Sequence, residues 1–359
     1  MELKPDAAPQ SIVVSHRALE DFAFRILLAS GVHEAKSKLI AQSLLAANLR
    51  GVDSHGVQLL PFYINQLLAG NIDADTLGTV ASESGCVMVY NAQNGLGAPI
   101  AEICCNHVNR LAAEHGVGIV VTREANHFGA CAYWGQRISA AGNIGIILCN
   151  ASPMVAPWQA KEPRVGTNPI CMSVPGDPET AWLLDMATTT VAAGKIYKAG
   201  INGVAEIPQG WAIDSEGRPT TSTEKALNGG MVMPLGGYKG SGLAVMVEIL
   251  CAVLSGGAMS TELGGIRIKG RPMRVSQFFM AIDVRRFQSA ESFDARMSKL
   301  VQMIKSAAAA ADYDEVLIAG EPEVRFEAER RRVGIPVPEG VWNTMLETAA
   351  RWQVKLIDA

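Results

Sequence analysis

The spacing of apolar residues changes character along this chain. Over the first 70 residues apolar side chains recur every three or four positions, the period of a helix with one buried face. This pattern predicts one helix over 16–31, capped by Ser15, and a second over 33–51. A third helix is predicted over 59–70, because Pro61 suits a first helical turn and Gly70 ends the pattern.

The middle of the chain instead alternates short apolar runs with helical stretches. We expect three strands separated by two helices over 87–152, where each strand is rich in valine and isoleucine. Later strands are predicted at 169–175, 181–187 and 276–284, with a long helix after Gly242 between the last two. The chain returns to helices at its end, over 293–311, 322–334 and 339–352.

These elements predict a mixed α/β fold in two parts. Residues 1–75 and 285–359 would form one helical domain from both termini. Residues 76–284 would form a second domain around a mixed sheet.

Composition narrows the class of protein. Hydrophobic residues make up 48% of the 359 positions, and a net charge of −4 argues against a basic nucleic-acid-binding face. Seven cysteines without a CxxC motif favour free thiols in a reducing compartment. The apolar stretch 240–259 is as long as a membrane span, but Glu248 and four glycines favour a buried helix. The N-terminus does not resemble a secretion signal, so we expect a cytoplasmic protein that binds no membrane.

Two histidines differ from the other four in their setting. His55 lies in "GVDSHGVQ" and His127 in "ANHFGA", and both segments are glycine-bounded loops at the ends of predicted elements. Asp53, Ser54 and His55 are consecutive and therefore point in different directions, so they cannot form a proton relay among themselves. Both histidines are therefore candidates for a functional role.

Two further segments suit an anionic ligand. Asp185 ends an apolar strand and precedes three threonines, which we expect to open a helix that binds an anion, although a plain N-terminal cap is the alternative. Lys239 lies among four glycines in "PLGGYKGSGLA". Neither segment matches a P-loop, and GxGxxG is absent from the chain, so a nicotinamide cofactor would not bind in the Rossmann manner.

Taken together and in order, "DSHG", "NHFG", "GTNP", "LDMAT", "GYKGSGLA" and "AGEPE" resemble the type-2 malate/L-lactate dehydrogenase family, over about residues 12 to 350. The resemblance implies hydride transfer between NAD(P)H and a 2-keto acid on a non-Rossmann fold, in a homodimer. It also implies a proton-exchange role for His55 or His127. We predict His55 as the acid/base group, with His127 as a second candidate and with Ser54 and Asn126 orienting the substrate, and we predict no metal. The predicted cofactor-binding residues are His127, Thr167, Asn168, Asp185, Met186, Ala187, Thr188, Thr189, Tyr238, Lys239, Gly240, Ala319, Gly320 and Glu321.

The chain departs from the family pattern at two positions. Many members have an arginine four residues after the first histidine, placed to pair with the substrate carboxylate, and this chain has Leu59 there. The family's "PGE" appears here as "AGE", with Ala319. The first departure makes a 2-keto acid that is bulkier or more apolar than malate plausible. We expect NAD or NADP as cofactor, with NAD preferred.

Three alternatives stay open at this point. The first is an NAD(P)H-dependent reductase of a cyclic imino acid such as piperideine-2-carboxylate. The second is a metal-dependent hydrolase that uses Asp53, His55 and His127. The third is a non-catalytic binding protein.

Overall fold

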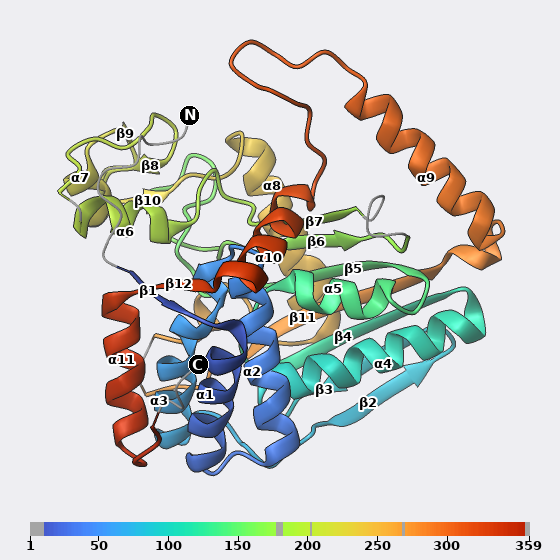
Figure 1. The fold of residues 1–359 in the computed structure, drawn as a ribbon, viewed down its shortest axis with the longest axis horizontal. Helices are drawn as coiled ribbons and strands as arrows, with labels where there is room; N and C mark the ends of the chain where they lie inside the picture. Colours follow the sequence, from blue (N-terminus) through green and yellow to red (C-terminus); the bar gives the residue numbers. More distant parts are fainter. Residues whose placement is uncertain (1–10, 177–181, 202, 268–269, 356–359) are drawn as a thin grey trace.

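A seven-stranded mixed sheet forms the centre of the computed structural model, which describes residues 11–176, 182–201, 203–267 and 270–355 (Figure 1). Its strands are β2 (Thr79–Ser84), β3 (Val87–Asn91), β4 (Val117–Ala125), β5 (Asn143–Cys149), β6 (Ile170–Ser173), β7 (Leu183–Met186) and β11 (Val275–Asp283). They are ordered β2-β3-β4-β11-β5-β6-β7. The β3–β4 pair is parallel and the other pairs are antiparallel, so the sheet lacks the parallel order of a Rossmann domain.

Helices cover both faces of this sheet. Helices α4 (Gly97–His115) and α5 (Cys131–Ser139) pack on one face, where Trp134 and Phe279 are fully buried. Helix α8 (Tyr238–Glu248) and its π-helical continuation η3 (Ile249–Val253) pack on the other face. The centre of the sheet is therefore buried on both sides, which explains why its inner strands are rich in apolar residues, whereas the edge strand β2 is polar and exposed.

Both ends of the chain meet in a helical cluster. Strand β1 (Ser11–Val14) pairs antiparallel with β12 (Ile335–Pro338). The helices of this cluster are α1 (His16–Ala29), α2 (Glu34–Leu49), α3 (Leu60–Leu68) and α11 (Glu339–Ala350). One apolar cluster runs from these helices into the sheet. The division into two domains at residues 75 and 285 stays a prediction.

Two regions lie beside this body. Helix α9 (Ala290–Lys305) projects away from it in Figure 1 and buries only Val301, before the chain returns to α10 (Glu321–Val333). A small unit has its own apolar cluster, which includes Val191 and Ile196. It consists of β8 (Ala212–Ile213), β9 (Pro219–Thr220), β10 (Met231–Val232), α6 (Ala193–Ile201) and α7 (Thr223–Leu227).

The mixed α/β fold and the six predicted strands β3 to β7 and β11 are confirmed, whereas β2 was not predicted and three expectations were wrong. The threonines after Asp185 do not open a helix, because the Thr188 N–H and hydroxyl both donate to the Thr167 carbonyl and α6 begins at Ala193. Helix α8 begins at Tyr238 rather than at Gly242, directly after Gly236 and Gly237 in left-handed conformations.

The third error concerns the apolar helix, which is buried on one side only. Its inner face includes Val247 and Glu248, whose carboxylate accepts hydrogen bonds from two buried asparagine amides. Its outer face carries Ile249 and Val253, which are half-exposed. Within the described parts of the chain, every helix is too short or too polar to span a bilayer.

Candidate active site

The two predicted histidines lie next to each other. His55 belongs to the 3-10 turn η1 (Asp53–His55), and His127 follows the end of β4. Their ring centroids are 5.7 Å apart with an angle of 23° between the planes. The Ser54 hydroxyl lies 3.0 Å from His55 Nδ1. Segments 72 residues apart in sequence thus form one imidazole pair.

Tyr63 and the backbone of Gly129 fix the position of the proton on His127. The Tyr63 hydroxyl, from α3, is 2.7 Å from His127 Nδ1, and the Gly129 N–H donates to the same nitrogen at 3.2 Å. An N–H group can only donate, so Nδ1 is an acceptor and the proton of the neutral ring is on Nε2. Burial, with the charges of His55 and Arg267, lowers the pKa of His127 to about 3. His127 is therefore a neutral hydrogen-bond donor at neutral pH.

His55 is the titratable partner in this pair. Burial and the nearby Arg267 guanidinium lower the pKa of its imidazole. Its ring is half-buried, and its Nδ1 faces the Ser54 hydroxyl. The Nε2 nitrogen is left as the atom that can exchange a proton with a substrate.

The remaining residues of "DSHG" hold this turn in place. Arg330 of α10 binds both carboxylate oxygens of Asp53 at 2.7 and 3.0 Å, and the Asn48 amide donates to Asp53 Oδ1 at 2.6 Å. A Cβ atom on Gly56 would lie 2.2 Å from Asn48 Oδ1, so only glycine fits there. Asp53 thus clamps the turn to a helix near the C-terminus and is not directed at the histidines.

Asn126 anchors the second loop from inside. Its buried side-chain N–H group donates to two oxygens of Asn94 and to the Gly95 carbonyl, whereas its Oδ1 has no hydrogen-bond partner. A Cβ atom on Gly97 would lie 2.1 Å from the His127 carbonyl oxygen. The loop that carries His127 therefore lies directly on the start of α4.

The three predicted cofactor segments converge around the end of β7. The Leu183 N–H donates to the Ala319 carbonyl at 3.2 Å, so the "AGE" turn borders "LDMAT". On the other side, the Leu235 N–H donates to the Thr188 carbonyl at 2.9 Å, and a Cβ atom on Gly240 would lie 2.7 Å from that same oxygen. The structure brings together segments that are up to 136 positions apart in sequence, from Leu183 to Ala319.

These segments suit a dinucleotide. Helix α8 starts with exposed Tyr238 and Lys239, and α10 starts at Glu321 after the left-handed Gly320. Free N–H groups and the helix dipole at the start of α8 attract phosphate, and Lys239 adds positive charge, whereas Glu321 makes the start of α10 less favourable for a phosphate. The segment between the starts of these two helices includes Met186, Ala187 and Thr189.

Two predicted cofactor residues lie at the back of this region. Asn168 is fully buried, and its amide bonds to the Ala151 N–H, the Ala244 carbonyl and Glu248. The Thr167 carbonyl holds Thr188. Thr167 thus supports the "LDMAT" segment through its backbone carbonyl, whereas Asn168 connects the turn before β6 to α8.

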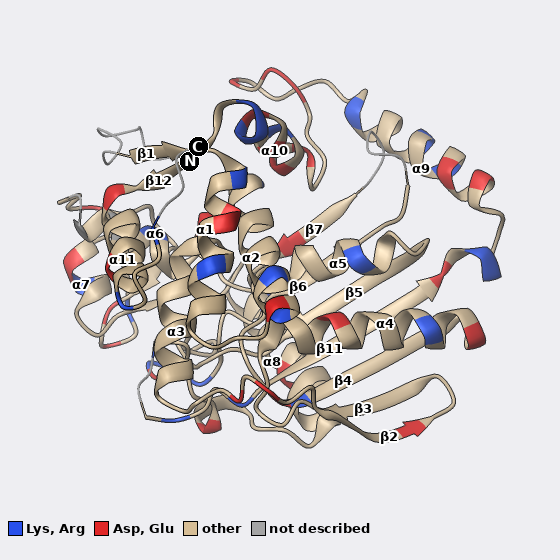
Figure 2. Cartoon of the chain, turned by 60° about the horizontal axis from the view of Figure 1, so that its bottom comes forward, with Lys and Arg blue, Asp and Glu red and all other residues tan. Residues whose placement is uncertain are grey.

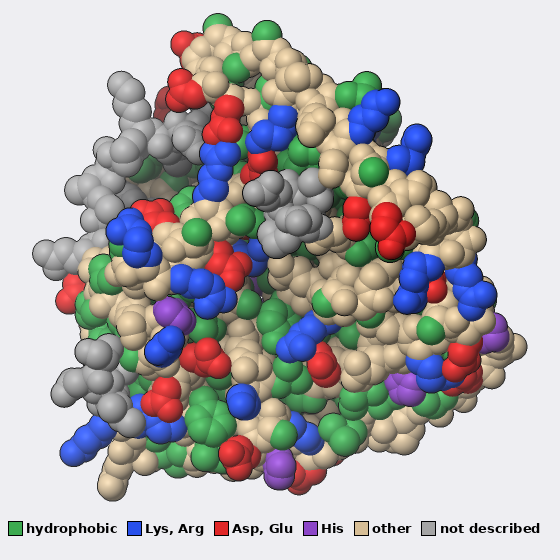
Figure 3. Space-filling model, turned by 45° about the vertical axis from the view of Figure 1, so that its right-hand side comes forward, with side chains coloured by type: hydrophobic (Ala, Val, Ile, Leu, Met, Phe, Trp, Pro, Cys, Tyr) green, Lys and Arg blue, Asp and Glu red, His purple; other side chains and the backbone are tan. Residues whose placement is uncertain are grey.

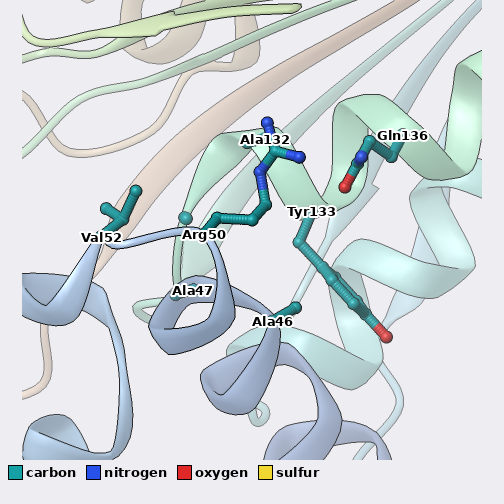
Figure 4. A pocket seen from close by; sticks show the side chains of 8 residues that line it. Ala46, Ala47, Arg50, Val52, Ala132, Tyr133 and Gln136 are labelled. Carbon is teal, nitrogen blue, oxygen red and sulfur yellow. The ribbon is translucent and has the colours of Figure 1, made fainter. Parts of the chain in front are cut away.

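A small cavity beside Asp185 is lined by a buried arginine. Figure 4 shows Arg50 extending from the end of α2 toward α5, near Ala132 and Gln136. The cavity measures about 10 Å³, the room of roughly one water, which is far too small for a cofactor. Arg50 Nε has no hydrogen-bond partner there. Desolvation of the Asp185 carboxylate raises its pKa to about 6. The carboxylate accepts a hydrogen bond from the Ala132 N–H at 2.7 Å.

Charges of both signs are mixed over the surface. Lysine and arginine side chains lie among aspartate and glutamate side chains on the face in Figure 3, and both signs occur on α4, α9 and α10 in Figure 2. A surface depression of about 200 Å³, lined by Ala160, Lys161, Glu162 and Arg164, contains none of the predicted site residues. The histidine pair and the loops around β7 therefore remain the candidate site.

Sequence reasoning missed two residues near the histidines. Tyr63 lies eight positions after His55, on α3, and it had no motif to mark it. Arg267 lies in the glycine-rich basic stretch "GGIRIKGRPMR", which was a signal that could have been used. Its charge affects both histidines.

The family model for malate/L-lactate dehydrogenase matches residues 14–346 of this chain. The chain belongs to this family. Malate dehydrogenase of Pyrococcus abyssi is 36% identical to it over 346 residues, which is 94% of each protein. L-sulfolactate dehydrogenase of Methanocaldococcus jannaschii is 34% identical over 322 residues, or 90% of this chain and 92% of that protein.

A solved structure agrees with this membership. The malate dehydrogenase of Pyrococcus horikoshii matches with a TM-score of 0.90 at 33% identity, covering 99% of this chain and 100% of that one. The chain is thus an NAD(P)-dependent dehydrogenase of 2-hydroxy acids. The resemblance identified from the six motifs is confirmed.

Proposed function

We propose that this dehydrogenase interconverts a 2-keto acid and its 2-hydroxy acid with His55 as the proton donor and acceptor. The pairing of a titratable His55 with a His127 that is fixed as an Nε2–H donor carries this proposal. A bound nicotinamide would supply or accept the hydride at the carbon next to the carboxylate.

The two rings have different tasks. His127 Nε2–H donates a hydrogen bond to the substrate oxygen and polarises the keto group, because Tyr63 and Gly129 occupy Nδ1. His55 delivers a proton to that oxygen during reduction and removes it during oxidation. Ser54 keeps the His55 ring oriented through Nδ1. Asn126, which holds the loop of His127 through its side-chain N–H group, orients the substrate through that loop.

The substrate we propose is bulkier or more apolar than malate. Leu59 occupies the position of the family's carboxylate-binding arginine, and its side chain is buried in the main apolar cluster. A buried apolar side chain at this position offers no partner to a second carboxylate.

We propose NAD rather than NADP as the preferred cofactor. A 2′-phosphate needs a cation that is free to bind it. Two cations near the "AGE" turn are already engaged, since Lys305 binds Glu321 and Arg325 binds Glu315. Glu321 itself lies at the start of α10 and would repel a phosphate at this turn.

We also propose a homodimer. The outer face of α8 and η3 exposes Val245, Ile249, Val253 and Leu254 at about helical spacing. An apolar stripe of this length on a helix is unfavourable in water and marks a protein interface. Light scattering should give twice the 38.1 kDa chain mass, and a monomer in solution would contradict this proposal.

One screen tests the reaction. Oxidation of NADH and of NADPH is followed with pyruvate, oxaloacetate, 2-ketoisocaproate and piperideine-2-carboxylate. We expect the highest kcat/KM with NADH and an apolar 2-keto acid. Preference for the imino acid would favour the imine-reductase alternative, and no oxidation with any keto acid would refute the proposed reaction.

A further inference from the structure

Helix α3 joins the histidine pair to a basic loop. Tyr63 of this helix bonds to His127, as described above. Its neighbour Phe62 carries the guanidinium of Arg267 on its ring, 5.1 Å from the centroid. Gln66, one turn further on, donates to the carbonyls of Gly265 and Ile266 at 3.3 and 2.9 Å. One helix therefore fixes both His127 and the segment that ends in Arg267.

Arg267 is the cation best placed to meet a ligand at this site. Its side chain is exposed, and its positive charge acts on both imidazoles. Within the described part of the chain, no carboxylate forms an ion pair with Arg267, and its guanidinium stacks on the Phe62 ring. Other arginines of this loop are occupied: Arg271 donates to the Thr261 and Leu263 carbonyls, and Arg274 binds Glu124.

We propose that Arg267 binds the carboxylate of the 2-keto acid and replaces the arginine that position 59 lacks. This inference rests on the proposed reaction. Leu59 immediately precedes α3, and Phe62, which supports Arg267, lies one turn after it, so the cation approaches the same region from a loop instead of from the helix. A guanidinium stacked on an aromatic ring keeps its N–H edge free for a carboxylate.

This placement fits the chemistry of the substrate. In a 2-keto acid the reacting carbonyl is bonded directly to the carboxylate carbon, so the two groups must be bound by neighbouring residues. Arg267 would hold the carboxylate while His127 donates to the keto oxygen. Because the cation is supplied by a loop, the carboxylate can be bound although position 59 carries a buried leucine.

The test combines a variant with a change in the substrate. Arg267→Met is compared with Arg274→Met, which removes an exposed arginine engaged by Glu124 from the same loop. Each variant is assayed with NADH and the best 2-keto acid of the screen, and with the methyl ester of that acid, which has no carboxylate charge.

We expect Arg267→Met to lower kcat/KM for the acid by about 100-fold, mainly through KM, because a charged partner loses its counterion. Turnover of the ester should change less than about threefold, and Arg267→Lys should recover part of the loss. Arg274→Met should behave like the wild type with both substrates.

Three outcomes would overturn the inference. One is an unchanged KM for the acid in Arg267→Met while the wild type is active, which leaves the proposed reaction intact. Another is an equal loss with acid and ester, since this indicates a structural role for Arg267. The third is a wild type that fails to oxidise NADH with every keto acid of the screen. The proposed reaction is then wrong, and the assignment of Arg267 is wrong with it.

Discussion

The histidine centre and the cofactor segments are built in opposite ways. His55 and His127 are half-buried and are fixed by side chains and backbone from α3, the turn after α2 and the loop after β4. At the predicted cofactor segments, by contrast, Tyr238 is 64% exposed and Lys239 is also exposed. These segments are connected to one another by backbone hydrogen bonds. Proton exchange depends on a defined tautomer and orientation, which requires close packing. Phosphate binding needs N–H groups and positive charge, which an open loop can supply.

The largest expected effect is at the histidine centre. His55→Gln should lower kcat by about 1000-fold, because it removes the group that exchanges the substrate proton while keeping the shape of the ring's polar edge. Steady-state kinetics measures this, and circular dichroism checks the fold. His115→Gln, at the exposed end of α4, is the matched control and should be fully active. Full turnover by His55→Gln would refute its assignment.

The pH dependence of stability distinguishes the buried centre from the exposed segments. The pKa of folded His127, about 3, lies below its unfolded value of about 6.5, so the unfolded chain binds more protons in between. The contribution of neutral His127 to the free energy of unfolding is therefore complete above about pH 6.5 and is lost as the pH falls toward 3. Because the ring is only half-buried, we expect a loss of about 2 kcal/mol between about pH 7 and pH 4.

Urea unfolding at both pH values measures this loss. The His127→Gln variant should lose less stability than the wild type over the same range, because glutamine does not titrate. Equal losses in the two proteins would show that His127 does not contribute to the acid sensitivity.

A smaller effect is expected in the cofactor segments. Lys239→Met should raise KM for NADH by about 10-fold through loss of one phosphate contact, with kcat and the melting temperature unchanged. Lys225→Met, an exposed lysine of α7, is the control. A fall in kcat with unchanged KM would mean that Lys239 acts on the reaction and not on cofactor binding.

The smallest effect should come from Tyr63→Phe. The variant keeps the Gly129 donor on His127 Nδ1 and removes only the hydroxyl, so kcat should fall about 5-fold. Nitrogen NMR of the imidazole should show a larger share of the other tautomer. An unchanged tautomer and unchanged kcat would mean that Gly129 alone orients the ring.

Much of the fold followed from local patterns. Helices α1 to α3 and the six strands β3 to β7 and β11 lie where the apolar pattern placed them, and Ser15 caps α1 as expected. The edge strand β2 was missed because it is polar and exposed. The errors occurred where tertiary hydrogen bonds override local preference. Thr188 bonds to Thr167, 21 positions earlier, and this contact replaces the helix start that the threonines suggested. The short strands β8 to β10 were missed because runs of two residues have no readable period.

The sequence by itself determined the elements of the sheet, the two loop histidines and the family, because periodicity and ordered motifs are properties of the chain. Only the tertiary structure decided that His55 faces His127, that Tyr63 and Gly129 fix the proton on Nε2, and that Arg330 holds Asp53. It also brought Arg267 beside the pair through Phe62 and Gln66, about 200 positions away. These contacts depend on packing between distant segments, which no local spacing encodes.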